Sequence, residues 1–482
     1  MKRKGLYSLM LVSALVLFII GTMLIGTLRK PLFVTAEKMY PDALAESHTQ
    51  GQIIEYTLVA DQGTSYVTTP DGAKITLDTW LYNDTFAQEQ IRITQGDTLR
   101  VTFVNKLDEP STIHWHGMRI PRNMDGVPGI SQDPVLPGES YLYEFTPQDA
   151  GTFWFHPHMN GSEQLERGLY GSLIVESEAP SYDDDIVLLI DDWRLDREGN
   201  LDENFITPHD LMHDGRWGQL VTVNGEIHPE YSVASGDRIR VRLINTANGR
   251  VFKPVSDAPW EVVAQDGMRM SEVRLLSDLG LVLAPGDRID LEIDLTDELL
   301  DTLTIRDEYV PQYPNDLVSI IVTQNKAELA NVNDPQSVKT SSSFDIPDWT
   351  HLAGRKPDFV YTLNAQNGSK GIDWVINDEV YDHKIKEIWK EGEVIKVRFA
   401  NESVRLHPMH LHGQFFQVIA RDGEVSEYPT WQDTVLVNPQ ETVDIAIAPT
   451  ELGTWPLHCH IQEHADAGMM RLVEVVPHYN EE

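Results

Sequence analysis

The chain has 482 residues but only one cysteine, Cys459, so no intrachain disulfide can form. Stability must come from hydrophobic cores, and a chain of this length divides into two to four domains. Long amphipathic helical patterns are scarce, and short alternating runs broken by Gly, Pro, Asn and Asp take their place. This pattern argues against a helical protein and predicts β-sandwiches or barrels.

Basic residues are also few. The chain carries 38 Lys and Arg against 75 Asp and Glu, a formal net charge of −37. Five of the basic residues and none of the acidic ones lie in the first 30, which leaves 33 basic against 75 acidic residues, a charge of −42, for the remainder. Such a surface repels nucleic acid and anionic lipid and attracts cations, although solubility alone is the simpler explanation. Nucleic acid is therefore not an expected partner.

Charge is absent from one stretch near the N-terminus. Three basic residues at 2–4 precede an uncharged run from Gly5 to Leu28, and Arg29 and Lys30 follow it. The run can span a bilayer, which needs about 20 apolar residues, and no convincing cleavage site precedes Arg29. We expect residues 1–30 to be an uncleaved membrane anchor, with a cleaved signal peptide as the alternative. Either way the bulk of the chain is exported, to the cell surface or periplasm when tethered, or secreted after cleavage.

Two sequence elements recur three times in the remaining chain. The first reads QGDTLRVTFVN, SGDRIRVRLIN and EGEVIKVRFAN, at 95–105, 235–245 and 391–401. The second reads LPGESYLYEF, APGDRIDLEI and NPQETVDIAI, at 136–145, 284–293 and 438–447. Three copies predict three related Greek-key β-sandwich domains. We place them at 45–178, 182–325 and 356–477, with a polar linker at 326–355.

Histidines follow this repeat in the first and third domains only. After the strand-ending Asn105, His114 and His116 lie nine and eleven residues on, and two histidines, His410 and His412, follow Asn401 at the same offsets. Further on, GTFWFHPH at 151–158 aligns with GTWPLHCH at 453–460. The middle domain has Pro254 and Ser256 at the first two offsets and no counterpart of the later motif, so we expect it to be a spacer.

Each H-x-H pair can aim both imidazoles one way, because residues two apart in a strand share a face. Four such pairs from two homologous domains predict a cage of eight imidazoles, which suits a small metal cluster. Imidazole alone does not distinguish zinc, copper, iron and nickel. Cys459 identifies the metal as copper. It lies between His458 and His460 and should therefore point away from the cage. There His407, His464 and Met469 can complete the two-histidine, thiolate and methionine set of a blue-copper site.

These motifs resemble those of the multicopper oxidases, the family of laccases and cuprous oxidases. The four signatures read HWHG at 114–117, HPH at 156–158, HPMHLHG at 407–413 and HCHIQEHADAGMM at 458–470. The resemblance covers the chain from about residue 45 to 477. It implies three cupredoxin-like domains that bind four coppers and couple four one-electron oxidations to the reduction of O2 to water.

Carried over by position, the resemblance assigns each copper its ligands. The type 1 copper would be held by His407, Cys459 and His464, with Met469 axial. The type 2 copper would take His114 and His410. The type 3 pair would take His116, His156 and His460 on one ion, and His158, His412 and His458 on the other. Glu463 and Asp125 match two acids of the family, Glu463 a relay of protons to bound oxygen, although Asp125 also suits a plain D-G turn.

Other questions stay open at this level. The electron donor is either a phenol or aromatic amine, as in laccases, or a low-valent metal ion such as Cu(I). The alternative function is a non-catalytic scaffold for copper storage or envelope assembly, although such a protein would be expected to lose cluster ligands. His209 and His213 are spaced i, i+4, but no third ligand is visible near them, which favours plain surface histidines. The sequence does not indicate an oligomeric state.

Overall fold

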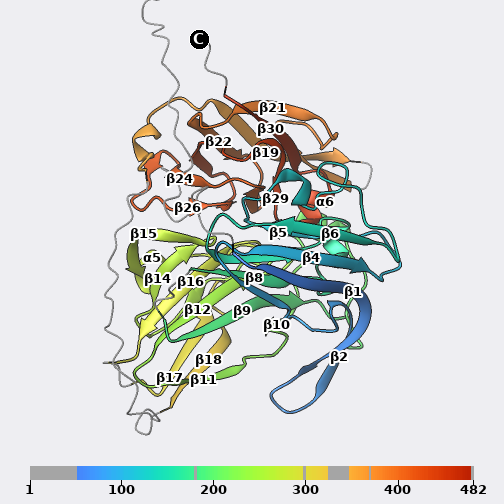
Figure 1. The fold of residues 1–482 in the computed structure, drawn as a ribbon, viewed down its shortest axis with the longest axis vertical. Helices are drawn as coiled ribbons and strands as arrows, with labels where there is room; N and C mark the ends of the chain where they lie inside the picture. Colours follow the sequence, from blue (N-terminus) through green and yellow to red (C-terminus); the bar gives the residue numbers. More distant parts are fainter. Residues whose placement is uncertain (1–50, 178–181, 297–299, 324–346, 369–370, 479–482) are drawn as a thin grey trace, which may run out of the picture. The chain divides into compact units, whose positions relative to one another are not determined.

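The part of the chain that the structure describes is built almost entirely of β-strands (Figure 1). This computed structural model describes residues 51–177, 182–296, 300–323, 347–368 and 371–478, which all belong to one compact unit, Val34–Glu482. Strands such as β4 (Thr98–Asn105) alternate buried and half-buried residues, the period-two pattern of a strand with one face in a core. The described helices have at most five residues. The predicted all-β sandwich fold class is confirmed.

The first pair of sheets is coloured blue to teal in Figure 1. One sheet has the order β2-β1-β4-β6 and consists of β1 (Ile53–Thr68), β2 (Lys74–Tyr82), β4 and β6 (Ser140–Phe145). The other has the order β3-β8-β7-β5 and consists of β3 (Gln90–Thr94), β5 (His114–His116), β7 (Gly151–His156) and β8 (Gly171–Glu176). Two short helices accompany them, η1 (Arg122–Met124) and α3 (Gly161–Gln164).

The second pair is coloured green to yellow. Its six-stranded sheet, β10-β9-β12-β16-β14-β15, consists of β9 (Asp184–Trp193), β10 (Leu220–Val223), β12 (Arg238–Asn245), β14 (Glu261–Gln265), β15 (Met268–Leu275) and β16 (Arg288–Asp294). Its four-stranded sheet, β11-β18-β17-β13, consists of β11 (Glu230–Ala234), β13 (Pro254–Val255), β17 (Thr302–Asp307) and β18 (Asn315–Thr323). The helices here are α4 (Pro208–Met212) and α5 (Leu276–Leu279).

The third pair is coloured orange to red. Its larger sheet, β20-β19-β22-β28-β24-β25 with β26 on β24, consists of β19 (Phe359–Gly368), β20 (Gly371–Ile376), β22 (Ile395–Asn401), β24 (Phe416–Arg421), β25 (Glu424–Val425), β26 (Trp431–Gln432) and β28 (Thr442–Ile447). The smaller sheet, β21-β30-β29-β23-β27, consists of β21 (Ile385–Lys390), β23 (His407–Leu411), β27 (Thr434–Val437), β29 (Gly453–Cys459) and β30 (Met470–Val476). The helices are η2 (Thr350–Leu352) and α6 (Gln462–Asp466).

The two repeated sequence elements are hydrogen-bonded neighbours in every pair of sheets. β4 pairs antiparallel with β6, β12 with β16, and β22 with β28. The Asn that ends the first element has the same role in all three copies, because its side-chain amide nitrogen donates to at least two backbone carbonyls in each. For Asn105 these are the carbonyls of Glu109 and Val135, both at 2.8 Å. This Asn fixes the loop that leads into the histidine strand of the first and third pairs.

Two of the predicted segments lie wholly or largely outside the described residues. They are the hydrophobic segment 1–30 and most of the linker 326–355. Among the residues that are described, no helix is both long and apolar enough to cross a membrane.

Candidate metal centre

The register between β23 and β29 places neighbouring residues on opposite faces. Met409 lies opposite Cys459, and His410 lies opposite His458. Opposed residues of an antiparallel pair share a face, whereas successive residues alternate. Cys459 and Met409 therefore turn into the hydrophobic core of the third pair of sheets, and His410 and His458 turn the other way. This confirms the opposed orientation predicted for Cys459 and its histidine neighbour.

The sulfur of Cys459 faces two imidazoles in that core. Its Sγ lies 3.7 Å from Nδ1 of His407 and 3.7 Å from Nδ1 of His464, and all three side chains are fully buried. The opposite nitrogen of each ring is held in place, since Nε2 of His407 is hydrogen-bonded to Ser403 Oγ (2.9 Å) and Nε2 of His464 donates to the carbonyl of His213 (2.8 Å). Both Nδ1 atoms are thereby directed toward the sulfur.

Met469 is fully buried in the same core cluster. Its amide donates to the carbonyl of His464 (3.0 Å), and its carbonyl accepts from the amide of Cys459 (3.0 Å). These two bonds tie the loop after β29 back onto the strand. Cys459 and the three residues predicted around its sulfur are thus brought together by the end of β29, helix α6, the loop after it and the start of β23.

The spacing of sulfur and nitrogens fits a bound metal ion. Metal–sulfur and metal–nitrogen bonds of about 2.3 and about 2.0 Å, the values for zinc, separate the two ligand atoms by about 3.7 Å in a trigonal site. Burial lowers the pKa of His464 to about 3 and keeps its imidazole neutral, as a ligand must be. Burial raises the pKa of the Cys459 thiol well above its usual value, so a cation is needed to hold the thiolate.

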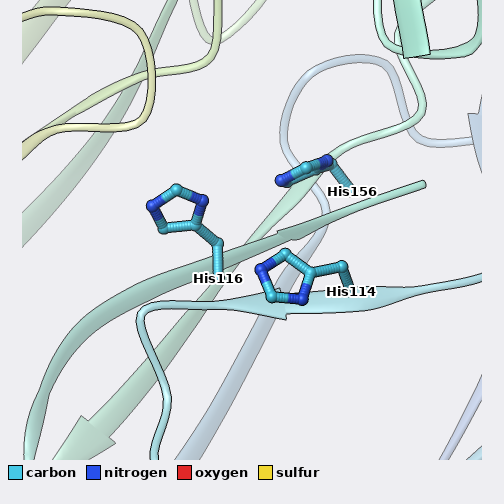
Figure 2. Close-up of side chains that lie close together, drawn as sticks. All are labelled: His114, His116 and His156. Carbon is cyan, nitrogen blue, oxygen red and sulfur yellow. The ribbon is translucent and has the colours of Figure 1, made fainter. Parts of the chain in front are cut away.

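Eight imidazoles gather on the other face, between the first and third pairs of sheets. β5 and β7 pair with His114 opposite His156, and Figure 2 shows these rings close to that of His116. From the third pair, His412 Nε2 lies 2.9 Å from His458 Nε2, which lies 3.4 Å from Nε2 of His158. Rings from the two pairs stack at 3.8 Å between centroids, His114 on His412 and His116 on His410. His460 completes the cage with its centroid 4.8 Å from that of His116.

Six buried nitrogens of this cage have no hydrogen-bond partner: Nε2 of His114, His156, His410 and His460, and Nδ1 of His116 and His460. The second nitrogen is often anchored to a backbone carbonyl, as in His114 to Asp125 (2.9 Å) and His156 to Pro157 (2.9 Å). An unsatisfied buried polar group costs about 1–3 kcal/mol, so six of them converging on one space call for bound groups. In metal-binding histidines, one ring nitrogen faces the metal and the other is hydrogen-bonded to a carbonyl or carboxylate, as in these rings. The residues therefore fit metal ions.

Two buried carboxylates orient the cage. Asp125, an expected acid, has Oδ2 3.0 Å from Nδ1 of His412 and Oδ1 3.2 Å from Nδ1 of His114. Asp433 lies on the opposite side, with Oδ1 3.1 Å from Nε2 of His116 and 3.3 Å from Nδ1 of His410. The sequence reasoning missed Asp433, because nothing in WQDT at 431–434 marks it as different from a strand end.

The second pair of sheets contributes to the cage without supplying a histidine to it. Arg288 of β16 is fully buried and donates to both oxygens of Asp433. Arg288 was also missed, although one signal was present. It stands in the repeat where the other two copies have Ser140 and Thr442, so the middle copy departs from the pattern at that position.

Glu463 is buried on α6, between His460 and His464 in the sequence. Its Oε1 accepts from Nδ2 of Asn248 (3.2 Å) and its Oε2 from the amide of Arg216 (3.2 Å). No hydrogen bond joins it to a cage histidine in the described part of the chain. Burial raises its pKa to about 7.

Known proteins have similar sequences and the same fold. Family models described as multicopper oxidase match residues 64–180 and 353–479. The structure is similar to that of a multi-copper oxidase from Pseudomonas thermotolerans, with 31% identity, 89% of this chain and 100% of that chain covered, and a TM-score of 0.74. The chain belongs to the multicopper oxidase family. It is thus a copper-dependent oxidoreductase that uses O2, and copper is the metal that the two histidine clusters fit.

Other relatives of this multicopper oxidase cover nearly its whole length. It is 28% identical over 463 residues to multicopper oxidase mco of Staphylococcus haemolyticus, which covers 91% of this chain and 92% of the relative. It is 26% identical to a Campylobacter jejuni multicopper oxidase described as a metallo-oxidase, with 94% of this chain and 98% of that chain covered and a TM-score of 0.71.

Proposed function

We propose that this multicopper oxidase takes single electrons from a donor on the Cys459 side and uses four of them, with four protons, to reduce O2 to two waters in the histidine cage. His407, Cys459, His464 and the axial Met469 would hold the type 1 copper. His114 and His410 would hold the type 2 copper. The type 3 pair would take His116, His156 and His460 on one ion, and His158, His412 and His458 on the other. These coppers supply the one-electron redox chemistry and the binding of O2.

One observation carries this proposal. The sulfur of Cys459 lies 3.7 Å from two imidazoles in one core, while the adjacent His458 lies 2.9 Å from His412 in the cage. The two clusters are therefore joined through a single peptide unit and its side chains. A storage scaffold has no need of such a covalent link between a sulfur site and a separate cage.

Protons are the second requirement, because forming two waters consumes four of them. Asp125 contacts His114 and His412 directly and is the acid nearest the cage on that side. Glu463 is held on α6 by Asn248 and Arg216. We assign both as acids that serve the proton supply.

Copper content, the blue absorption band and oxygen uptake test the function together. The expected result for purified, copper-loaded protein is about four coppers per chain, an intense blue band and O2 uptake with a phenolic dye or with Cu(I). A copper-loaded blue protein that consumes no O2 with either donor would contradict the proposal and support a storage or assembly role.

Location and domain division complete the proposal. Each pair of sheets falls within one of the three domains expected from the repeats, and we infer domain boundaries at those positions. Residues 1–30 would tether the oxidase outside the cytoplasm. Expression of the full chain tests this, because a tether leaves the intact chain in the membrane fraction, whereas cleavage releases a shorter chain.

A further inference from the structure

The hairpin between β14 and β15 carries a buried aspartate at its tip. Asp266 and Gly267 form the turn, with φ angles of +48° and +79°, and an Asp-Gly pair is a common choice for such a turn. Turns of this kind lie at the surface of most proteins. Asp266 nevertheless has no exposed surface. The needs of the turn explain the residue type but not its burial.

The tip of this hairpin packs closely against the first pair of sheets. A Cβ at Gly151, the first residue of β7, would overlap the carbonyl oxygen of Gly267. A Cβ at Gly267 would crowd the ring of Phe153 in the same strand. Glycine at both positions therefore lets the two backbones approach one another. β7 ends at the cage residue His156, so the second pair of sheets reaches a cage strand through this turn.

Asp266 accepts hydrogen bonds from three backbone amides. Its Oδ1 accepts from the amide of Arg288, in its own pair of sheets (3.0 Å). Its Oδ2 accepts from the amides of Asp433 and Thr434, in the third pair (3.3 Å each). Nη1 of Arg288 also lies 3.6 Å from Oδ1. One oxygen is therefore bound to the second pair of sheets and the other to the third, which requires a group with two acceptor oxygens.

Asp433 and Thr434 in turn contact two rings of the cage. The Thr434 hydroxyl lies 3.1 Å from Nδ1 of His410 and 3.3 Å from Nε2 of His116. The backbone carbonyl of Asp433 lies 3.0 Å from Nδ1 of His410, and its carboxylate lies 3.1 Å from Nε2 of His116. The opposite nitrogens, Nε2 of His410 and Nδ1 of His116, are two of the buried atoms without a hydrogen-bond partner.

We propose that Asp266 is a positioning residue of the histidine cage and that it acts through the backbone of Asp433 and Thr434. The carboxylate fixes these two residues, and they fix the outer nitrogens of His116 and His410. The inner nitrogens are thereby directed into the space for the metal. This inference rests on the proposed function, in which the cage holds copper. It gives the second pair of sheets a role in metal binding beyond that of a spacer.

Asp266→Asn tests the carboxylate without disturbing the turn, because asparagine also tolerates a positive φ. Its single acceptor oxygen can bind only one of the two sets of amides, and its NH2 group then faces the other set. We expect the cage to bind copper at least about tenfold more weakly, measured by competition with a chelator. The blue band of the type 1 site should keep its wild-type intensity and show that the third pair of sheets is folded.

Asp290→Asn is the matched control. Asp290 lies two residues beyond Arg288 on β16 and is also buried. Its Oδ1 accepts from the Thr152 hydroxyl (2.6 Å) and its Oδ2 from Nη1 of Arg242 (3.1 Å). Among the described residues it forms no hydrogen bond to a cage histidine. This variant should lower the Tm, as Asp266→Asn should, but keep the wild-type affinity of the cage for copper.

The EPR signal of the type 2 copper provides a second readout that does not depend on turnover. The proposed function assigns this ion to His114 and His410, so a displaced His410 ring should change its hyperfine splitting. Asp266→Asn should show this change and Asp290→Asn should not. Thr434→Val, which removes the hydroxyl that contacts both rings, should reproduce it. The type 1 signal should be the same in all of these proteins.

The outcomes separate this inference from the proposed function. Wild-type copper affinity of the cage, with an unchanged type 2 signal, in Asp266→Asn overturns the positioning role. Equal losses of cage copper in Asp266→Asn and Asp290→Asn also overturn it, because weaker packing between the pairs of sheets would then be the cause. Loss of the blue band together with the cage copper overturns it as well, since the effect would not be confined to the cage. Wild-type protein that binds copper in the cage but takes up no O2 contradicts the proposed function and leaves the positioning role standing.

Discussion

Arg288 and Asp433 form a bidentate, fully buried ion pair between β16 and the residue that precedes β27. Nη1 of Arg288 lies 2.9 Å from Oδ1 and Nη2 lies 2.7 Å from Oδ2. Burial by itself would raise the pKa of Asp433, but the adjacent guanidinium outweighs it and holds the pKa at about 2. Asp433 therefore stays ionised beside His116 and His410. The second pair of sheets, which carries no cage histidine among its described residues, thus positions two rings of the cage.

Replacing Arg288 should therefore lower both the free energy of unfolding and the copper content of the histidine cage. Arg288→Met leaves the Asp433 carboxylate buried without its cation, and losing one partner of such a pair costs about 3–5 kcal/mol. We expect a lower unfolding free energy of that size, measured by urea denaturation, and loss of cage copper measured by metal analysis. Arg306→Met is the control, because Arg306 pairs with Asp257, which is 90% exposed, and such pairs contribute about 0–1 kcal/mol. Equal losses of unfolding free energy in the two variants would show that burial does not make the Arg288–Asp433 pair more important than an exposed pair.

Gly117, the last residue of HWHG, makes room for this ion pair. It has φ +83°, and a Cβ there would overlap the guanidinium of Arg288 and the carboxylate of Asp433. Gly117→Ala should lower stability and reduce the copper content of the cage. Gly199 has a similar φ of +88° with open space around it, so Gly199→Ala should show only the cost of backbone strain, about 1–2 kcal/mol. Thermal unfolding of the two copper-loaded variants compares them, and Gly199→Ala should be the milder change.

Replacing Cys459 should affect one cluster and spare the other. Cys459→Ser removes the sulfur that faces His407 and His464 but keeps the strand that positions His458 and His460. We expect loss of the blue band and of donor oxidation, with part of the cage copper retained. A variant that keeps its blue colour would show that the sulfur is not a copper ligand.

The burial of Asp191 predicts that the stability of the protein depends on pH. Burial, with Glu166 and Asp192 nearby, raises the pKa of Asp191 well above its usual value of 3.8, and Tyr170 donates to its Oδ2 (2.7 Å). Between these two pKa values the folded chain keeps a proton that the unfolded chain releases. The contribution of this group is therefore full below about pH 4 and is lost as the pH rises through the folded pKa.

Asp191→Asn keeps the hydrogen-bond acceptor and cannot ionise. The Tm of this variant minus that of wild type should therefore rise between about pH 5 and about pH 8. Asp257→Asn, at an exposed position, is the control in which this difference should stay constant. A difference for Asp191→Asn that falls with pH would reverse the expected sign and show that Asp191 is ionised when folded.

Side chains alternate between the two faces of a strand, and this explains why much of the site was predictable. In LHCH at 457–460, period two alone dictates that Cys459 faces away from His458, and the β23–β29 register agrees. The repeat likewise indicated which strands would be neighbours, because β4–β6, β12–β16 and β22–β28 all pair. The roles of Arg288 and Asp433 were not predictable, because an Arg and an Asp 145 positions apart carry no shared pattern.

Residue type and strand period were enough to indicate which side chains can bind metal and which way those on the histidine strands point. The surroundings of these side chains depend on tertiary packing. That packing brought Arg288 against Asp433 and the backbone carbonyl of His213 against the ring of His464. These contacts depend on how separate pairs of sheets pack together. Local periodicity carries no information about that packing.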